Sequence, residues 1–254
     1  MTPRISKRWI ILAAGISLAL PAHAFDLNEM LKGVLGKPAS QPATTSGVDA
    51  LSTTEINAGL KEALTRGAEA AVTQLGQKDG FFGNAALKIP LPPSLQKAEK
   101  AMRLFGMGKQ ADELVLSMNR AAEAAVPEAK TLLVGAVKEM TLEDAKGILT
   151  GGQTSATDFF RKKTETKLTE RFAPIVKATT DKVGLAQQYN QYAGMAAQFN
   201  LVDKQQASVE QYVTQQALDR LYTVIGEKEA AIRANPMQAG SDLLKKVFGA
   251  VMGK

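Results

Sequence analysis

The sequence of 254 residues contains no cysteine, one histidine and one tryptophan. The histidine, His23, and the tryptophan, Trp9, both lie within the first 24 residues. The rest of the chain therefore has no imidazole and no thiol, which excludes Ser-His-Asp and Cys-His catalysis and any zinc site built from those ligands. We predict no catalytic residue, no cofactor and no metal site, which weighs against an enzyme. Without cysteine, an oxidising compartment imposes no disulfide framework.

The first 24 residues have the pattern of a cleavable export signal. Three basic residues precede an uncharged stretch at 9–20, which is too short to cross a bilayer as a helix. The run Pro-Ala-His-Ala at 21–24 provides the small residues that signal peptidase accepts. A buried core helix is the alternative for this stretch. The pattern favours a signal peptide over residues 1–24, cleavage after Ala24 and a periplasmic mature protein.

Acidic and basic residues are nearly balanced once the export signal is set aside. The whole chain has a formal net charge of +6, and loss of residues 1–24 removes three basic residues and no acidic one, which leaves +3. Nucleic-acid binding requires clustered lysine and arginine, so we expect no nucleic-acid partner. Aromatic residues make up 6% of the chain. Alanine, leucine, glutamate, lysine and glutamine are abundant, which favours helix.

Three segments follow one another along the predicted mature chain. Residues 25–36 have apolar side chains at helical spacing and predict a short amphipathic helix. Residues 37–47 contain two prolines and no periodicity, which indicates a Pro/Ser/Thr linker. Residues 48–254 are long enough to bury a sizeable core. We predict that they form a single all-α domain, a helical bundle built from helix hairpins.

Apolar residues recur at helical spacing throughout this domain. Ser52 and Glu55 have the spacing of a capping box at the start of the first helix. Pro174 is expected to kink or split a long helix, and Thr214 is expected to act as a cap inside another. The predicted helices cover residues 52–76, 94–105, 109–125, 127–140, 141–150, 154–183, 185–199, 209–235 and 241–251.

Residues 140–163 predict a helix, a glycine turn and a second helix. Thr141 and Asp144 form a capping box, and Leu142 begins the apolar stripe of the first helix. Gly151 and Gly152 end that helix and are expected to adopt left-handed conformations. The second helix then begins at residue 154 or 155.

Residues 80–93 are the least helical part of the domain. Three prolines within this segment, Pro90, Pro92 and Pro93, require an extended backbone. We predict that the segment wraps around the bundle, with Phe81 and Phe82 entering the core. A short edge strand is the alternative.

One set of polar residues could form a ligand pocket. Three of them interrupt an alanine-rich helix, and the other three come from the two arms of the glycine turn at 151–152. If these helices pack together, their side chains meet in one cluster, which would be either a pocket or a structural network. The candidate residues are Asn119, Arg120, Glu123, Asp144, Asp158 and Arg161.

Several strings along the domain resemble one bacterial family. They lie at residues 78–81, 89–92, 118–127, 140–152 with Thr157, 174–176, 212–214 and 232–236. Together, over residues 51–249, they resemble the family DUF4197, a domain of unknown function. The resemblance implies an exported protein of Gram-negative bacteria with a mostly helical fold. It implies no activity and no catalytic residue, and residues 25–47 lie outside it.

Three functions are compatible with these observations. The first is a non-enzymatic binding or interaction module of the periplasm, whose partner is an envelope protein or a small ligand. The second is a hydrolase of envelope glycans that uses two carboxylates from the region of Glu123, Asp144 and Asp158. The third is a peripheral membrane protein, in which lysines flank the apolar face of a C-terminal amphipathic helix. That face comprises Leu243, Leu244, Val247, Phe248 and Val251.

Overall fold

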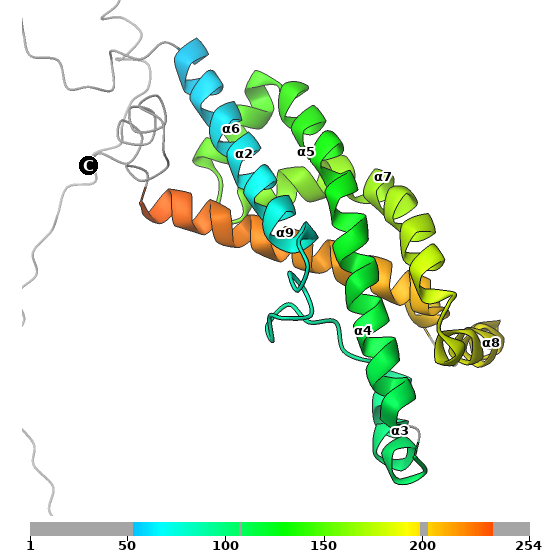
Figure 1. Cartoon of the computed structure of the whole chain (residues 1–254). Coiled ribbons are helices and arrows are strands. Elements are labelled where there is room, and N and C mark those ends of the chain that lie inside the picture. The colour runs from blue at the N-terminus through cyan, green and yellow to red at the C-terminus, as the bar shows by residue number, and fades with distance from the viewer. Residues whose placement is uncertain (1–52, 107, 199–202, 236–254) are drawn as a thin grey trace, which may run out of the picture. The chain divides into compact units, whose positions relative to one another are not determined.

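The computed structural model describes residues 53–106, 108–198 and 203–235 (Figure 1). The predictions for residues 1–47, for the Ser52 cap and for residues 241–254 lie outside these ranges. No strand occurs in the described ranges, and all the described helices belong to one compact unit, so the prediction of an all-α helical bundle is confirmed. The α-helices are α2 (Thr53–Gly76), α3 (Pro93–Leu104), α4 (Gly108–Ala125), α5 (Ala129–Lys138), α6 (Leu142–Thr150), α7 (Ser155–Thr180), α8 (Gly184–Gln198) and α9 (Val209–Ala234), with short 3₁₀ helices η1 (Val126–Glu128) and η2 (Lys204–Gln206).

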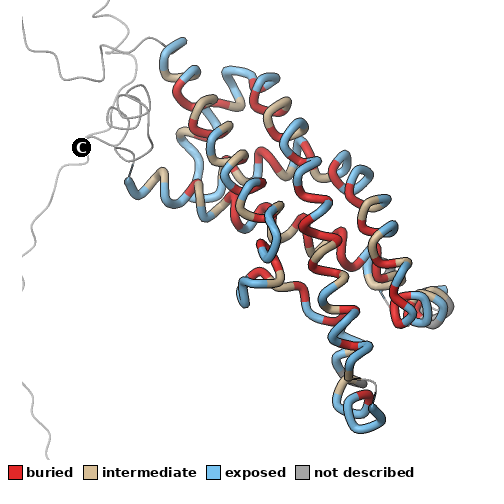
Figure 2. Tube along the Cα trace, viewed as in Figure 1, coloured by how far each residue is buried: buried red, intermediate tan, exposed pale blue. Residues whose placement is uncertain are grey.

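The core lies where α4, α7 and α9 pack against one another. Helix α7 contacts both α4 and α9 along its length, while α2 packs on α9 and α5 (Figure 1). Buried positions follow the inward faces of these helices (Figure 2). They recur at the helical spacing that the sequence predicted. Fully buried examples are Leu114 and Met118 in α4, Leu168 and Phe172 in α7, and Leu218 and Leu221 in α9.

Helix α4 presents alanines where it meets its neighbours. Ala121, Ala122 and Ala125 are fully buried. Because small side chains let a neighbouring helix approach closely, this end of α4 packs at the centre of the bundle.

The segment between α2 and α3 wraps the bundle without forming a strand, as predicted. It turns sharply at Asp79, whose φ of 66° is unusual for a residue with a side chain. Phe81 is fully buried and Leu87, Ile89 and Leu91 also face the core. Phe82 is only half-buried, so one phenylalanine, not both, enters the core.

The capping box of Thr141 and Asp144 is present at the start of α6. The prediction of left-handed glycines after α6 is wrong, because Gly151 has a φ of −79° and a ψ of −179°, and Gly152 has no positive φ either. Glycine is needed there for a different reason. A Cβ atom on Gly151 would lie 2.5 Å from the carbonyl oxygen of Gly147 and 2.7 Å from Cβ of Ser155.

Three local predictions need correction. Helix α7 continues through Pro174 as one helix, so it is not split there, and a kink at Pro174 stays a prediction. Thr214 lies inside the continuous helix α9, whose N-cap is Ser208. Leu142 is 61% exposed and does not join the apolar stripe of α6. Within the described ranges, no helix combines the length and the apolarity needed to cross a lipid bilayer.

Candidate functional site

Asn119, the first of the predicted cluster residues, holds the wrapping segment against α4. Its side chain is fully buried. The Oδ1 atom accepts a hydrogen bond from the backbone N–H of Ile89 at 2.8 Å, and Nδ2 donates to the carbonyl oxygen of Ile89 at 2.9 Å. Nδ2 also donates to the carbonyl oxygen of Val115 at 2.7 Å. The amide therefore satisfies both backbone groups of a buried residue that has no strand partner.

Glu123 and Arg120 hold the other end of the same segment. Oε1 of Glu123 accepts hydrogen bonds from the backbone N–H groups of Phe81 and Phe82, each at 3.1 Å. Arg120 donates to Oε2 of Glu123 at 2.5 Å and to Oδ1 of Asp79 at 2.7 Å. Hydrogen bonds to these two carboxylates raise the pKa of Arg120. The group fastens the turn at 79–82 onto α4.

The remaining three candidate residues have other partners. Oδ2 of Asp144 accepts hydrogen bonds from the N–H and the hydroxyl of Thr141, and these bonds lower the pKa of Asp144. Asp158 accepts a hydrogen bond from the hydroxyl of Thr154 at 3.0 Å. Among the described residues, no hydrogen bond or ion pair joins Asp144 or Asp158 to the side chains on α4.

Arg161 faces α9. Its guanidinium contacts Oδ1 of Asp219 at 3.3 Å and lies 4.5 Å from the ring centroid of Tyr222. Tyr222 is buried and shares a hydrogen bond with the hydroxyl of Thr164 at 2.9 Å, and burial raises its pKa to about 12. The structure thus brings together Asn119, Arg120 and Glu123, and places Asp144, Asp158 and Arg161 elsewhere; a ligand-binding role for any of them stays a prediction.

A second polar network, which sequence analysis missed, joins α6, α7 and α9. The buried carboxylate of Glu229 accepts hydrogen bonds from the backbone N–H of Ala156 at 3.0 Å and of Thr157 at 2.9 Å. The hydroxyl of Thr157 donates to the same carboxylate at 2.7 Å. Helix α7 begins without a side-chain cap from Thr154, so Glu229 provides its cap from another helix. A carboxylate is well suited to this helix end, where the macrodipole is positive.

Arg233 completes the network one turn further along α9. Its Nε and Nη2 atoms donate to Oε1 of Glu229 at 3.1 and 2.8 Å. Nη2 also donates to the carbonyl oxygen of Ile148 at 3.0 Å and to the hydroxyl of Ser155 at 2.7 Å. The only sequence signal for this pair is the spacing of Glu229 and Arg233, four residues apart at the end of a helix, which is typical of an ordinary surface ion pair.

An apolar pocket lies beside this ion pair, between α2, α6, α7 and α9. Its cavity volume is about 30 Å³, which is room for on the order of one or two water molecules. Leu60 and Leu64 of α2 line one side, and Phe160 and Ile225 line the other. Glu229 and Arg233 form its polar end. Apolar walls with one polar group are the usual composition of a small-molecule site.

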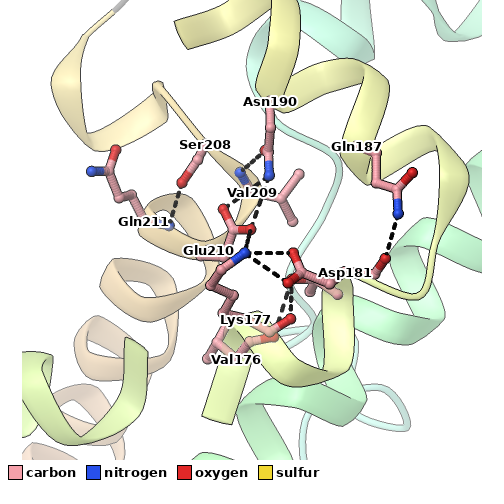
Figure 3. A network of polar contacts seen from close by, with 10 residues as sticks. Val176, Lys177, Asp181, Gln187, Asn190, Ser208, Val209, Glu210 and Gln211 are labelled. Atoms are coloured by element: carbon pink, nitrogen blue, oxygen red, sulfur yellow. Dashed lines mark hydrogen bonds and ion pairs between the residues drawn. The ribbon is translucent and has the colours of Figure 1, made fainter. Parts of the chain in front are cut away.

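Another polar network lies where α8 joins α7 and α9 (Figure 3). Asn190 accepts a hydrogen bond from the N–H of Val209 at 2.8 Å and donates to both carboxylate oxygens of Glu210 at 2.9 and 3.1 Å. Lys177 pairs with Asp181 at 2.7 Å and lies 3.9 Å from Glu210. Every charged group drawn in Figure 3 has a partner. We therefore interpret the network as structural: it holds α8 against α7 and α9.

The fold and these sites define an all-helical protein with an apolar pocket that has an ion pair at its polar end. The chain belongs to the family described as protein of unknown function (DUF4197), whose family model matches residues 50–249. The resemblance found in the sequence strings is therefore confirmed. A comparison with curated proteins found no match, and neither did a comparison with solved structures.

Proposed function

We propose that this protein is exported to the periplasm of Gram-negative bacteria and acts there as a non-enzymatic binding module. The location is supported by the export-signal pattern of residues 1–24. The binding role is supported by the apolar pocket between α2, α6, α7 and α9. We propose that its ligand is a small apolar molecule, or the end of an alkyl chain, with one polar group beside Glu229 and Arg233.

The walls of the pocket favour the alkyl part of such a ligand. Leu60, Leu64, Phe160 and Ile225 offer no hydrogen-bonding side chain, so a polar ligand would lose its hydrogen bonds to water without replacement. An alkyl chain gains free energy from the same burial.

The polar end of the pocket favours one hydrogen-bond acceptor on the ligand. Nη1 of Arg233 has no hydrogen-bond partner among the described residues, whereas Nε and Nη2 are occupied. Glu229 neutralises the charge of Arg233 through their ion pair of 2.8 Å. A neutral or singly charged head group is therefore better suited than a multiply charged one.

The alternative of a glycan hydrolase is less well supported. Its candidate carboxylates already accept hydrogen bonds within the bundle: Glu123 from two backbone N–H groups, Asp144 from Thr141 and Asp158 from Thr154. Hydrolysis by a carboxylate pair requires two such groups facing one cleft. The residues that carry the C-terminal membrane alternative lie outside the described ranges.

The test measures binding of a fluorescent fatty-acid analogue to the chain without residues 1–24, which contains no tryptophan that would interfere. Gly67 lines the pocket, and a Cβ atom there would lie 3.9 Å from Cδ1 of Ile232, another lining residue, so Gly67→Leu adds a side chain at this wall. We expect it to weaken binding about tenfold or more. The control is Gly147→Leu, also in a helix, where a Cβ atom meets nothing within 4 Å. Equal binding by both variants, or no binding by the parent, would contradict the proposal.

A shortened chain tests whether a segment of the protein itself fills the pocket. The apolar residues at 243–251 follow α9, whose last turn lines the pocket. If removal of residues 236–254 strengthens probe binding several-fold, the pocket is filled by this segment in the intact protein, and the proposal of an external ligand is wrong. Unchanged binding after the removal supports the proposal.

A further inference from the structure

A second cleft, lined by polar and apolar side chains, lies between α5 and α7. These two helices pack against each other and lie side by side in Figure 1. The cleft has a volume of about 410 Å³, much larger than the apolar pocket, and shares no lining residue with it. This volume is in the range of small-molecule sites. The cleft is therefore a separate candidate for binding.

Gly135 keeps the α5 wall of this cleft open. It lies inside α5 and lines the cleft together with Leu132 and Ala136. Glycine is less favourable than alanine inside a helix, so its presence there calls for a reason. Close packing is not that reason, because a Cβ atom at Gly135 would meet nothing within 4 Å. The missing side chain instead leaves room for a ligand against α5.

Charged side chains of both signs line the cleft. Lys163 and Lys167 come from α7, one helical turn apart, and Glu139 comes from the end of α5. Nζ of Lys163 lies 3.8 Å from Oδ2 of Asp144. Lys167 and Glu139 have no ion-pair partner in the part of the chain that the structure describes. The two lysines and the two carboxylates balance, so the unpaired charges are one of each sign.

Thr164 also lines the cleft, but its hydroxyl group cannot donate to a ligand. The hydroxyl donates its one proton to the carbonyl oxygen of Phe160 at 2.7 Å and shares a hydrogen bond of 2.9 Å with the hydroxyl of Tyr222. Recognition of a charged ligand therefore depends on Lys167 and Glu139.

We propose that this cleft binds a short peptide with free termini, whose carboxylate contacts Lys167 and whose ammonium group contacts Glu139. A ligand with both charges suits a cleft that has no excess of either. Lys167 and Glu139 do not pair with each other, so their charged groups are separated. The charges of a peptide lie at opposite ends, whereas those of a single amino acid share one carbon atom. Small apolar side chains of the peptide would contact Leu132 and Ala136.

Isothermal titration calorimetry with trialanine, using the chain without residues 1–24, tests the charge requirement. N-acetyl-trialanine lacks the ammonium group and trialanine amide lacks the carboxylate. We expect trialanine to bind, and each of the other two peptides to bind about tenfold more weakly. No binding of trialanine would overturn the proposal. Equal affinity for the three peptides would also overturn it, because the terminal charges would then make no contribution.

Two substitutions assign each terminus of the peptide to its side chain. Lys167→Gln should weaken binding of trialanine about tenfold and leave binding of trialanine amide unchanged. Glu139→Gln should weaken binding of trialanine equally and leave binding of N-acetyl-trialanine unchanged. The control is Lys162→Gln, at an exposed position of α7 that does not line the cleft, and it should change none of the three. All three positions are exposed, so these variants should keep the parent melting temperature.

A substitution at Gly135 tests the location independently of charge. Gly135→Leu places a side chain in the open space of the cleft and should weaken binding of trialanine about tenfold or more. Gly147→Leu, at a helical glycine outside the cleft where a Cβ atom also meets nothing within 4 Å, should leave it unchanged. Unchanged binding in Gly135→Leu would place the peptide elsewhere and overturn the proposal. Binding of the fatty-acid analogue should be the same in Gly135→Leu as in the parent, which separates this cleft from the apolar pocket.

Discussion

Glu123 shows how one buried carboxylate on α4 can hold a loop that has no regular structure. It accepts hydrogen bonds from Phe81 and Phe82 and pairs with Arg120, although it is only 5% exposed. Its position in an alanine-rich helix looked like a candidate for chemistry when only the sequence was considered. The structure instead gives it three donors that need a permanent acceptor.

Replacement of this carboxylate should therefore destabilise the protein strongly. Glu123→Ala leaves two backbone N–H groups and a guanidinium without their acceptor, and we expect it to lower the free energy of unfolding by about 3 kcal/mol. Urea unfolding followed by circular dichroism measures the change. Glu113→Ala, an exposed position on the same helix, should change stability by less than about 0.5 kcal/mol. Similar values for the two variants would refute a structural role for Glu123.

Gly151 and Gly152 are adjacent, but only the first is packed against its neighbours. A Cβ atom on Gly151 would lie 2.5 Å from the carbonyl oxygen of Gly147, whereas one on Gly152 would meet nothing within 4 Å. We expect Gly151→Ala to lower the free energy of unfolding by about 1–3 kcal/mol. Gly152→Ala should change it by less than about 1 kcal/mol. Thermal unfolding of the two variants measures these changes. A larger loss of stability in Gly152→Ala than in Gly151→Ala would contradict the prediction.

At the scale of the helix, the start of α7 depends on a residue of α9. The backbone N–H groups of Ala156 and Thr157 donate to Glu229, because Thr154 provides no side-chain cap. Glu229→Ala should lower the free energy of unfolding by about 3–5 kcal/mol, since it also leaves Arg233 without its partner. Hydrogen exchange should accelerate first in the opening turn of α7. Glu227→Ala, an exposed position on the same helix, is the control and should leave that turn protected.

The number of residues between two bonded groups explains which contacts the sequence could predict. The capping box of Thr141 and Asp144 is formed by residues three apart, so local spacing was sufficient to find it. The helices of the core were found from their apolar periodicity for the same reason. Glu229 lies 73 residues from Ala156, and no local pattern connects them. Asn119 similarly bonds to Ile89 across 30 residues, so its partner becomes visible only in the fold.

For the whole molecule, burial is concentrated in the helices that cross its centre. Leu168 and Phe172 of α7, and Leu218 and Leu221 of α9, are fully buried. Among the side chains of α3 that the structure describes, Met102 is the buried one, at 9% exposure. Local stability follows the amount of buried apolar contact, so these helices should open at very different free energies.

Hydrogen exchange followed by mass spectrometry can rank them in the intact protein. Amides of α7 and α9 should exchange only through global unfolding, because these helices share the central core. Amides of α3 should exchange on the order of a hundredfold faster, through local opening of the hairpin that α3 forms with α4. Mild denaturant should accelerate α7 and α9 together while leaving the rate of α3 nearly unchanged, since local opening exposes little new surface. Equal protection of α3 and α7 would mean that the hairpin is part of the central cooperative unit, and that its exposed end is supported by contacts beyond those with α4.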